Sequence, residues 1–81
     1  MTTQPDWPHD LHLDLRGLAC PLPVLKTRKA LAGLARGNRV MVEATDPLAA
    51  IDIPNYVRES GHRLVAAETG GDIYRCLIER L

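Results

Sequence analysis

The chain has 81 residues, in which ten lysines and arginines are balanced by ten aspartates and glutamates, so the formal net charge is zero. A chain of this length forms one small domain with a single core and is too short to enclose a large substrate pocket. The balanced charge disfavours direct binding to nucleic acid or to an anionic membrane, so we expect the partners to be proteins.

The first residues have no periodic pattern, and residues 1–9 are predicted to be a flexible N-terminal tail ahead of a single domain over residues 10–81. From residue 11 onward, leucines alternate with polar residues, as in a strand that is buried on one face. Leu11, Leu13 and Leu15 share one side of this predicted strand, and Gly17 ends it.

A helix is predicted over residues 21–36, directly after Cys20. Proline is favoured at the first position of a helix, so we place Pro21 there and Cys20 at the N-cap. The predicted inward face comprises Val24, Thr27, Leu31, Leu34 and Ala35. The opposite side carries Lys26, Lys29, Gly33 and Arg36, and Leu22 lies near it.

A second strand is predicted over residues 39–45, where Val40, Val42 and Ala44 alternate and point inward. Met41 lies on the other side of this strand and indicates a central strand that is contacted on both faces.

Asp46-Pro47 has the sequence of a second helix start. Pro54 follows within the same helical run, and proline removes an internal helix hydrogen bond. We therefore expect a short turn at residues 47–52 and a better helix at residues 54–60, which Gly61 ends.

The last part of the chain is predicted to be a hairpin of residues 63–68 and 72–80 with its turn at Gly70-Gly71. Cys76 falls on the same face of the final strand as Tyr74 and Ile78 and is interpreted as a core residue. The predicted fold class is an α/β two-layer sandwich of order βαβαββ, with a mixed four-stranded sheet and two helices on one face.

Cys20 is the candidate reactive residue, because a sulfur at a helix N-terminus is stabilised as the thiolate by about 0.3–1 kcal/mol, and by up to ~2 if partly buried. Such a gain lowers a thiol pKa by about 0.5 to 1.5. Pro21 and Pro23 stiffen the approach to the sulfur and leave the N–H groups of Leu22 and Val24 to face it. The alternative is that Cys20 only packs at the start of the helix.

The sequence lacks the residue patterns of metal sites, dithiol redox sites and phosphate-binding loops. The two cysteines do not form a Cys-x-x-Cys pair, and the three histidines have no ligand spacing with either, so we expect no metal and no cofactor. Neither a resolving cysteine nor a phosphate-binding glycine loop is present. No apolar leader and no apolar run of about 18–20 residues occurs, so a soluble cytoplasmic protein with reduced thiols is expected.

The run Leu13-Asp14-Leu15-Arg16-Gly17-Leu18-Ala19-Cys20-Pro21-Leu22-Pro23, followed by Lys29-Ala30-Leu31, resembles the signature of the TusA/SirA-like sulfur-carrier family. The segments Asp46-Pro47, Asp52-Ile53-Pro54 and Gly61-His62 are similar as well. The resemblance implies a fold like the C-terminal domain of translation initiation factor three. It also implies a sulfurtransferase that receives sulfane sulfur as a persulfide from a cysteine desulfurase or another donor and passes it to a relay protein. The pathways that it implies are 2-thiouridine formation in tRNA, cofactor synthesis and sulfur oxidation.

The resemblance places the carried sulfur on Cys20 and assigns the shape of the site to Arg16, Gly17, Pro21 and Pro23. Leu22, Lys26 and Lys29 are the candidate partner-binding residues. Leu22 stands where many members of the tRNA-thiolation branch carry an acidic residue. Two other functions stay open: an interaction or regulatory module that binds RNA through Lys26, Lys29 and Arg36, and a redox sensor that forms a sulfenate on Cys20.

Overall fold

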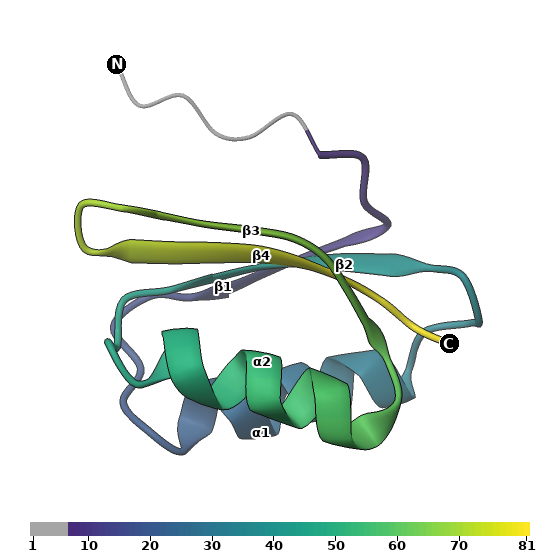
Figure 1. Ribbon diagram of the computed structural model, residues 1–81, viewed down its shortest axis with the longest axis horizontal. Coiled ribbons are helices and arrows are strands. Elements are labelled where there is room, and N and C mark those ends of the chain that lie inside the picture. Colours follow the sequence, from purple (N-terminus) through teal and green to yellow (C-terminus); the bar gives the residue numbers. More distant parts are fainter. Residues whose placement is uncertain (1–6) are drawn as a thin grey trace.

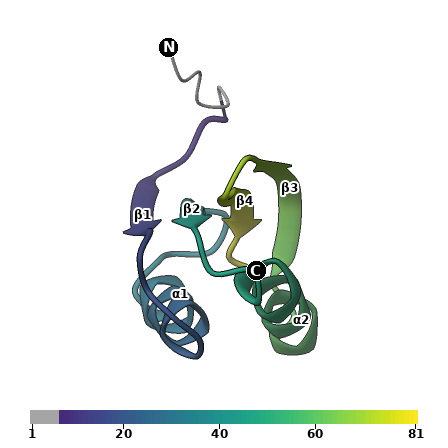
Figure 2. The same ribbon diagram turned by 90° about the vertical axis from the view of Figure 1, so that its left-hand side faces the viewer.

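The computed structural model of the protein describes residues 7–81. Its elements are β1 (Leu11–Leu15), α1 (Leu22–Ala32), β2 (Arg39–Ala44), α2 (Ala49–Ser60), β3 (Arg63–Gly70) and β4 (Ile73–Glu79). The strands form one layer and both helices cover one face of it, so the predicted α/β two-layer architecture is confirmed (Figures 1 and 2). Most of the predicted tail, residues 1–6, lies outside the described residues.

The sheet has the strand order β1-β2-β4-β3. β1 and β2 are parallel, as expected for strands that are joined through a helix, and β4 runs antiparallel to both β2 and β3. β2 is therefore central, as Met41 indicates, and the side chain of Met41 is buried. Figure 2 shows α1 beneath β1 and α2 beneath β3.

The core lies between the sheet and the helices. Val40, Val42 and Ala44 supply it from β2 as predicted, and Cys76 supplies it from β4. Within residues 7–81, neither helix is long and apolar enough to cross a membrane.

The helix α1 is shorter than the predicted helix over residues 21–36. It begins at Leu22 with Pro21 as its N-cap, and it ends at Ala32. Gly33 donates its N–H to the Ala30 carbonyl at 3.1 Å, and the chain then turns back toward β2. Gly33 lies in the last part of the predicted helix and Gly37 directly follows it, and both oppose helix formation there. Thr27 and Leu31 are buried as predicted, but Ala35 is exposed because it lies beyond the helix.

The helix α2 is continuous from Ala49 to Ser60, so the predicted break before Pro54 is wrong. Ala49, Ile53 and Val57 recur every four residues and are buried on one face. Burial of this face outweighs the single hydrogen bond that Pro54 cannot make.

The hairpin of β3 and β4 is confirmed, but its turn is displaced by one residue. Gly70 still pairs with Ile73, so Gly71 and Asp72 form the turn. Gly71 has a φ of 60°, which L side chains rarely adopt.

A row of charged side chains crosses the face of the sheet that the helices leave uncovered. Glu43 is almost fully buried there and accepts hydrogen bonds from His12 at 2.5 Å and from Arg75 at 2.8 Å. The half-exposed Glu68 contacts Arg75 at 3.6 Å from β3. Burial alone would raise the pKa of Glu43, but the hydrogen bonds from His12 and Arg75 outweigh it and lower this pKa. Glu43 thus stabilises the fold at neutral pH, and this contribution is lost as the pH falls through its lowered pKa.

Glu43→Ala is expected to lower the free energy of unfolding by about 3–5 kcal/mol, because it leaves the buried Arg75 guanidinium without its acceptor. Urea denaturation at neutral pH measures the change. Glu68→Ala is the matched control, since it removes an exposed carboxylate from the same guanidinium and should cost less than about 1 kcal/mol. Equal losses in the two variants would show that burial of Glu43 does not matter.

Candidate functional site

Three residues that are distant in sequence meet at one edge of the sheet. The loop after β1 carries Cys20, the loop after β2 carries Asp46, and the first turn of α2 carries Asp52. Because β1 and β2 are parallel and each leads into a helix, their C-terminal ends and the starts of both helices lie at the same edge (Figure 1).

Cys20 is exposed at this edge, and it donates hydrogen bonds to two carboxylates that follow β2 in the chain. Its backbone N–H donates to Oδ2 of Asp46 at 2.6 Å, and its Sγ donates to Oδ2 of Asp52 at 3.4 Å. The other carboxylate oxygen of Asp46 accepts the N–H of Leu48 at 2.9 Å, so Asp46 joins the two loops.

These carboxylates raise the pKa of the Cys20 thiol above its ordinary value. The largest cause is the hydrogen bond from the thiol to Asp52, followed by desolvation and by the negative charges of Asp52 and Asp46. The prediction of a lowered thiol pKa is therefore wrong, and Cys20 is predominantly a thiol at neutral pH in the free protein.

The local backbone explains why the N-terminal end of α1 does not offset the rise that the carboxylates cause in the pKa of Cys20. Pro21, not Cys20, is the N-cap of α1, so the sulfur lies one residue further from the helix than predicted. The N–H of Leu22 donates to the carbonyl of Ala19 at 2.9 Å and does not face the sulfur. The effect of a helix dipole falls off quickly beyond the first turn, so the nearby carboxylates dominate.

Arg16 and Gly17 shape the turn that leads to Cys20. Gly17 has a φ of 83° and donates its N–H to the hydroxyl of Thr45 at 2.8 Å, which ties the β1 loop to the end of β2. Arg16 forms two side-chain hydrogen bonds with Asp14, at 2.8 and 2.9 Å. This contact lowers the pKa of Asp14 to about 2.

The two motif prolines occupy different environments. Pro23 is buried and its carbonyl accepts the hydroxyl of Thr27 at 2.8 Å, which anchors the first turn of α1. Pro21 is exposed and lines a groove of about 300 Å³ between α1 and α2, together with Asp52 and Glu59.

The predicted partner-binding residues do not form one surface depression. Leu22 is 43% exposed near Cys20. Lys26 and Lys29 instead line a separate groove between α1 and β1, which Leu22 does not line.

Asp46 and Asp52 were missed as site residues. The sequence indicated Asp46 as a helix start, and both aspartates belong to segments that carry the family resemblance, but neither was predicted to lie at the site. The signal that could have identified them is the parallel pairing of the first two strands, which brings the loops after both strands to one edge.

Cys76 is fully buried, as its interpretation as a core residue required. Burial raises the pKa of its thiol to about 12. Of the two cysteines, only Cys20 is therefore accessible to another protein.

Comparisons with known proteins show which family and which fold this chain resembles. Residues 12–80 match the family model described as sulfurtransferase TusA. The chain is 34% identical over 68 residues to the Bacillus subtilis (strain 168) protein named "Putative sulfur carrier protein YrkF". The match covers 84% of this chain and 37% of that protein, so the chain spans little more than a third of the length of this relative.

Among solved structures, the fold resembles the SirA-like protein from Desulfitobacterium hafniense, with a TM-score of 0.76 and 24% sequence identity. This similarity covers 86% of the present chain and 96% of the other and supports the fold. The family model matches nearly all of the described residues and includes Cys20 and both carboxylates around it. The chain therefore belongs to the TusA family of sulfurtransferases and sulfur carriers.

Proposed function

We propose that Cys20 carries sulfur as a persulfide, which it accepts from a donor protein such as a cysteine desulfurase and passes to an acceptor protein. Membership of the TusA family supports sulfur transfer in general. The observation that carries the assignment to Cys20 is its exposed, free thiol in the loop between β1 and α1, with a carboxylate oxygen of Asp52 3.4 Å from the sulfur.

The transfer is an exchange at sulfur. The Cys20 thiolate attacks the outer sulfur of a persulfide on the donor, so that a bond forms between Cys20 and that sulfur while the donor's sulfur–sulfur bond breaks. The donor leaves as a thiolate and takes up a proton, and Cys20 holds the transferred sulfur as a persulfide. No net oxidant or reductant is needed, because a sulfane sulfur moves from one cysteine to another.

The raised pKa of Cys20 requires that the thiol lose its proton before or during the attack. Asp52 is placed to accept this proton, since its Oδ2 already accepts the hydrogen bond from Sγ. A partner that brings a positive charge near Asp46 and Asp52 would offset their negative charge and lower the thiol pKa. In this proposal the thiol becomes reactive in the complex and is less reactive in the free protein.

The surroundings of Cys20 are compatible with protein partners. The sulfur lies at an exposed edge beside an open groove of about 300 Å³, so a large partner can reach it. A peroxide-sensing role is less well supported, because such cysteines have a lowered pKa.

Labelled sulfur tests the proposal directly. Incubation with a cysteine desulfurase and ³⁵S-cysteine is expected to label the unmodified protein and Cys76→Ser but not Cys20→Ser, and thiol reductants should release the label. Non-reducing electrophoresis measures it. Cys76→Ser is the matched control, because it removes the other thiol of the chain. Label retained on Cys20→Ser, or none acquired by the unmodified protein from any sulfane-sulfur donor, contradicts the proposal.

Asp52→Asn tests the protonation of the thiol. It removes the nearest negative charge, so the pKa of Cys20 should fall and the thiolate fraction at neutral pH should rise, by about tenfold for each drop of one in pKa. The rate of alkylation by iodoacetamide as a function of pH measures the change, and its midpoint should move to lower pH. Glu59→Gln makes the same change of charge two turns along α2 and should leave the midpoint in place. An unchanged midpoint in Asp52→Asn would show that this carboxylate does not control the thiol.

A further inference from the structure

A groove separate from the Cys20 edge lies between β1 and α1. Its volume is about 510 Å³, and it is lined by Leu11, Leu13, Lys26, Lys29, Ala30, Gly33 and Leu34. We call it the β1–α1 groove. It shares no lining residue with the groove beside Cys20.

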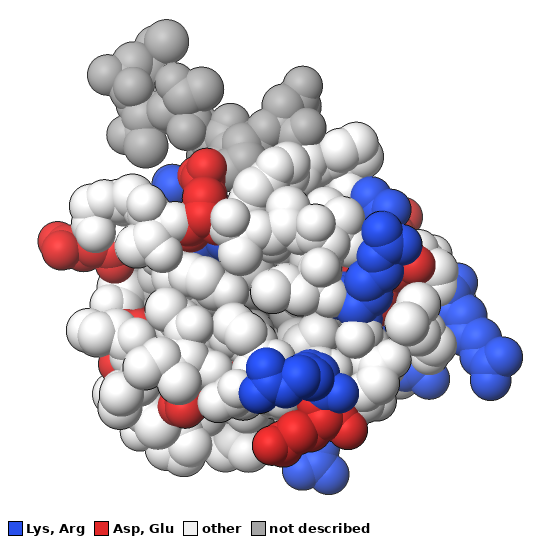
Figure 3. Space-filling model, viewed as in Figure 1, with Lys and Arg blue, Asp and Glu red and all other residues white. Residues whose placement is uncertain are grey.

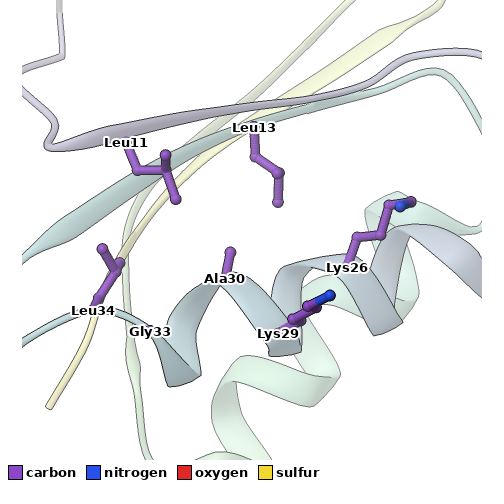
Figure 4. Close-up of a pocket in the computed structure, with 7 residues that line it drawn as sticks. All are labelled: Leu11, Leu13, Lys26, Lys29, Ala30, Gly33 and Leu34. Atoms are coloured by element: carbon purple, nitrogen blue, oxygen red, sulfur yellow. The ribbon is translucent and has the colours of Figure 1, made fainter.

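The two ends of the β1–α1 groove differ in chemistry. Figure 4 shows Leu11 and Leu13 extending from β1 toward Ala30, with Leu34 and Gly33 at the same end as Leu11. Lys26 and Lys29 lie further along α1, at the other end. Leu11 is 37% exposed, and an aliphatic side chain placed there would bury its surface.

Both lysines of the chain line this groove, although the chain as a whole has no net charge. Neither lysine forms an ion pair within the described residues, where the ion pairs are made by histidine and arginine. On the face seen in Figure 3, basic side chains gather toward the right and the lower edge, and acidic side chains are more frequent toward the left. The two free ammonium groups beside an apolar floor are therefore a local feature that suits carboxylates.

The groove also borders an open strand edge. β1 is at the end of the sheet and pairs with β2 alone among the described strands. Its register with β2 is regular from Leu11 to Leu15, so its outer backbone groups are arranged to pair with a further strand. The opposite edge strand, β3, has a register shift between Leu64 and Ala66, and such irregularities impede strand addition.

We propose that the β1–α1 groove binds an extended acidic segment of a partner protein, which adds to the sheet along β1. Backbone hydrogen bonds to β1 give this segment its position. On the helix side, an aliphatic residue contacts Leu11 and Ala30, and carboxylates reach Lys26 and Lys29. This inference goes beyond sulfur transfer and does not require Cys20.

Two other occupants fit the groove less well. A second copy of the chain that pairs through β1 would bring the lysines of both copies to the same seam, where their charges repel. RNA would meet the lysines, but the groove floor is aliphatic and lacks an aromatic side chain on which a base could stack. An acidic protein segment matches both the charge and the apolar floor.

The probe is a short fluorescent peptide in which every second residue is threonine, and the positions between the threonines are taken in turn by valine and glutamate. It is made with this sequence and with the reversed sequence, so that it can pair with β1 in either strand direction. Fluorescence anisotropy with the full chain should detect binding of at least one order. The same peptides with lysine in place of glutamate should bind about tenfold more weakly or not at all. N-methylation of the peptide nitrogens that face β1 removes the strand hydrogen bonds without changing charge, and it should abolish binding.

K26E/K29E should weaken binding of the acidic peptide by about tenfold or more, because it places like charges in the groove. R58E/R63E is the matched control: these arginines line another groove, beside α2 and β3, and their reversal should leave the affinity unchanged. Circular dichroism verifies that both variants are folded. Amide chemical shifts of the unmodified chain should change at residues 11–15 when the peptide is added.

Several results would overturn the inference. These are no binding of either acidic peptide, equal binding of the lysine peptides, an unchanged affinity in K26E/K29E, or shift changes confined to β3. Dimers of the free chain that dissociate in a β1 variant would assign the groove to a second copy. If a single-stranded RNA binds the chain more tightly than the acidic peptides do, and K26E/K29E abolishes this binding, the groove would be assigned to nucleic acid. Because none of these measurements uses sulfur, failure here leaves the role of Cys20 unaffected, and loss of sulfur transfer leaves the groove unaffected.

Discussion

The parallel pairing of β1 with β2 is the constraint on which the site depends. A parallel pair cannot be closed by a tight turn, so α1 must carry the chain back to the opposite edge, where β1 began, before β2 begins. The loops after β1 and β2 then lie side by side, and Asp46 joins them through the N–H groups of Cys20 and Leu48. The site is thus assembled from two successive strand–loop–helix units, neither of which contains all of its groups.

The Cys20 thiol is accessible, but the charges at this edge lower its reactivity. Helix ends favour anions, but at Cys20 two carboxylates within the same edge oppose a third negative charge. The free protein therefore holds its sulfur in the less nucleophilic form. An exposed thiol that stays protonated reacts slowly with small oxidants and electrophiles, whereas a docked protein can change the local charge. Under the proposed function, such an arrangement would favour transfer to selected partners over reaction with small molecules.

The sequence was sufficient for the order of elements, the strand that is central and the residues that fill the core, because periodic burial patterns survive folding unchanged. Val40, Val42 and Cys76 are examples. It was insufficient where tertiary packing competes with a local preference: burial of Ile53 and Val57 carries α2 through Pro54, and glycines end α1 before Ala35. The thiol pKa was predicted with the wrong sign, because Asp52 lies 32 residues away in sequence and only the fold brings its carboxylate to the sulfur.

The burial of Cys76 has a consequence for how long a persulfide could last. Enzymes that resolve such groups by themselves use a second thiol that attacks the first and releases sulfide. Here the second thiol among the described residues is buried in the core, and its pKa is raised to about 12, so under the proposed function it could not attack a persulfide on Cys20. Under the proposed function, the lifetime of the loaded form would then be set by encounters with other molecules.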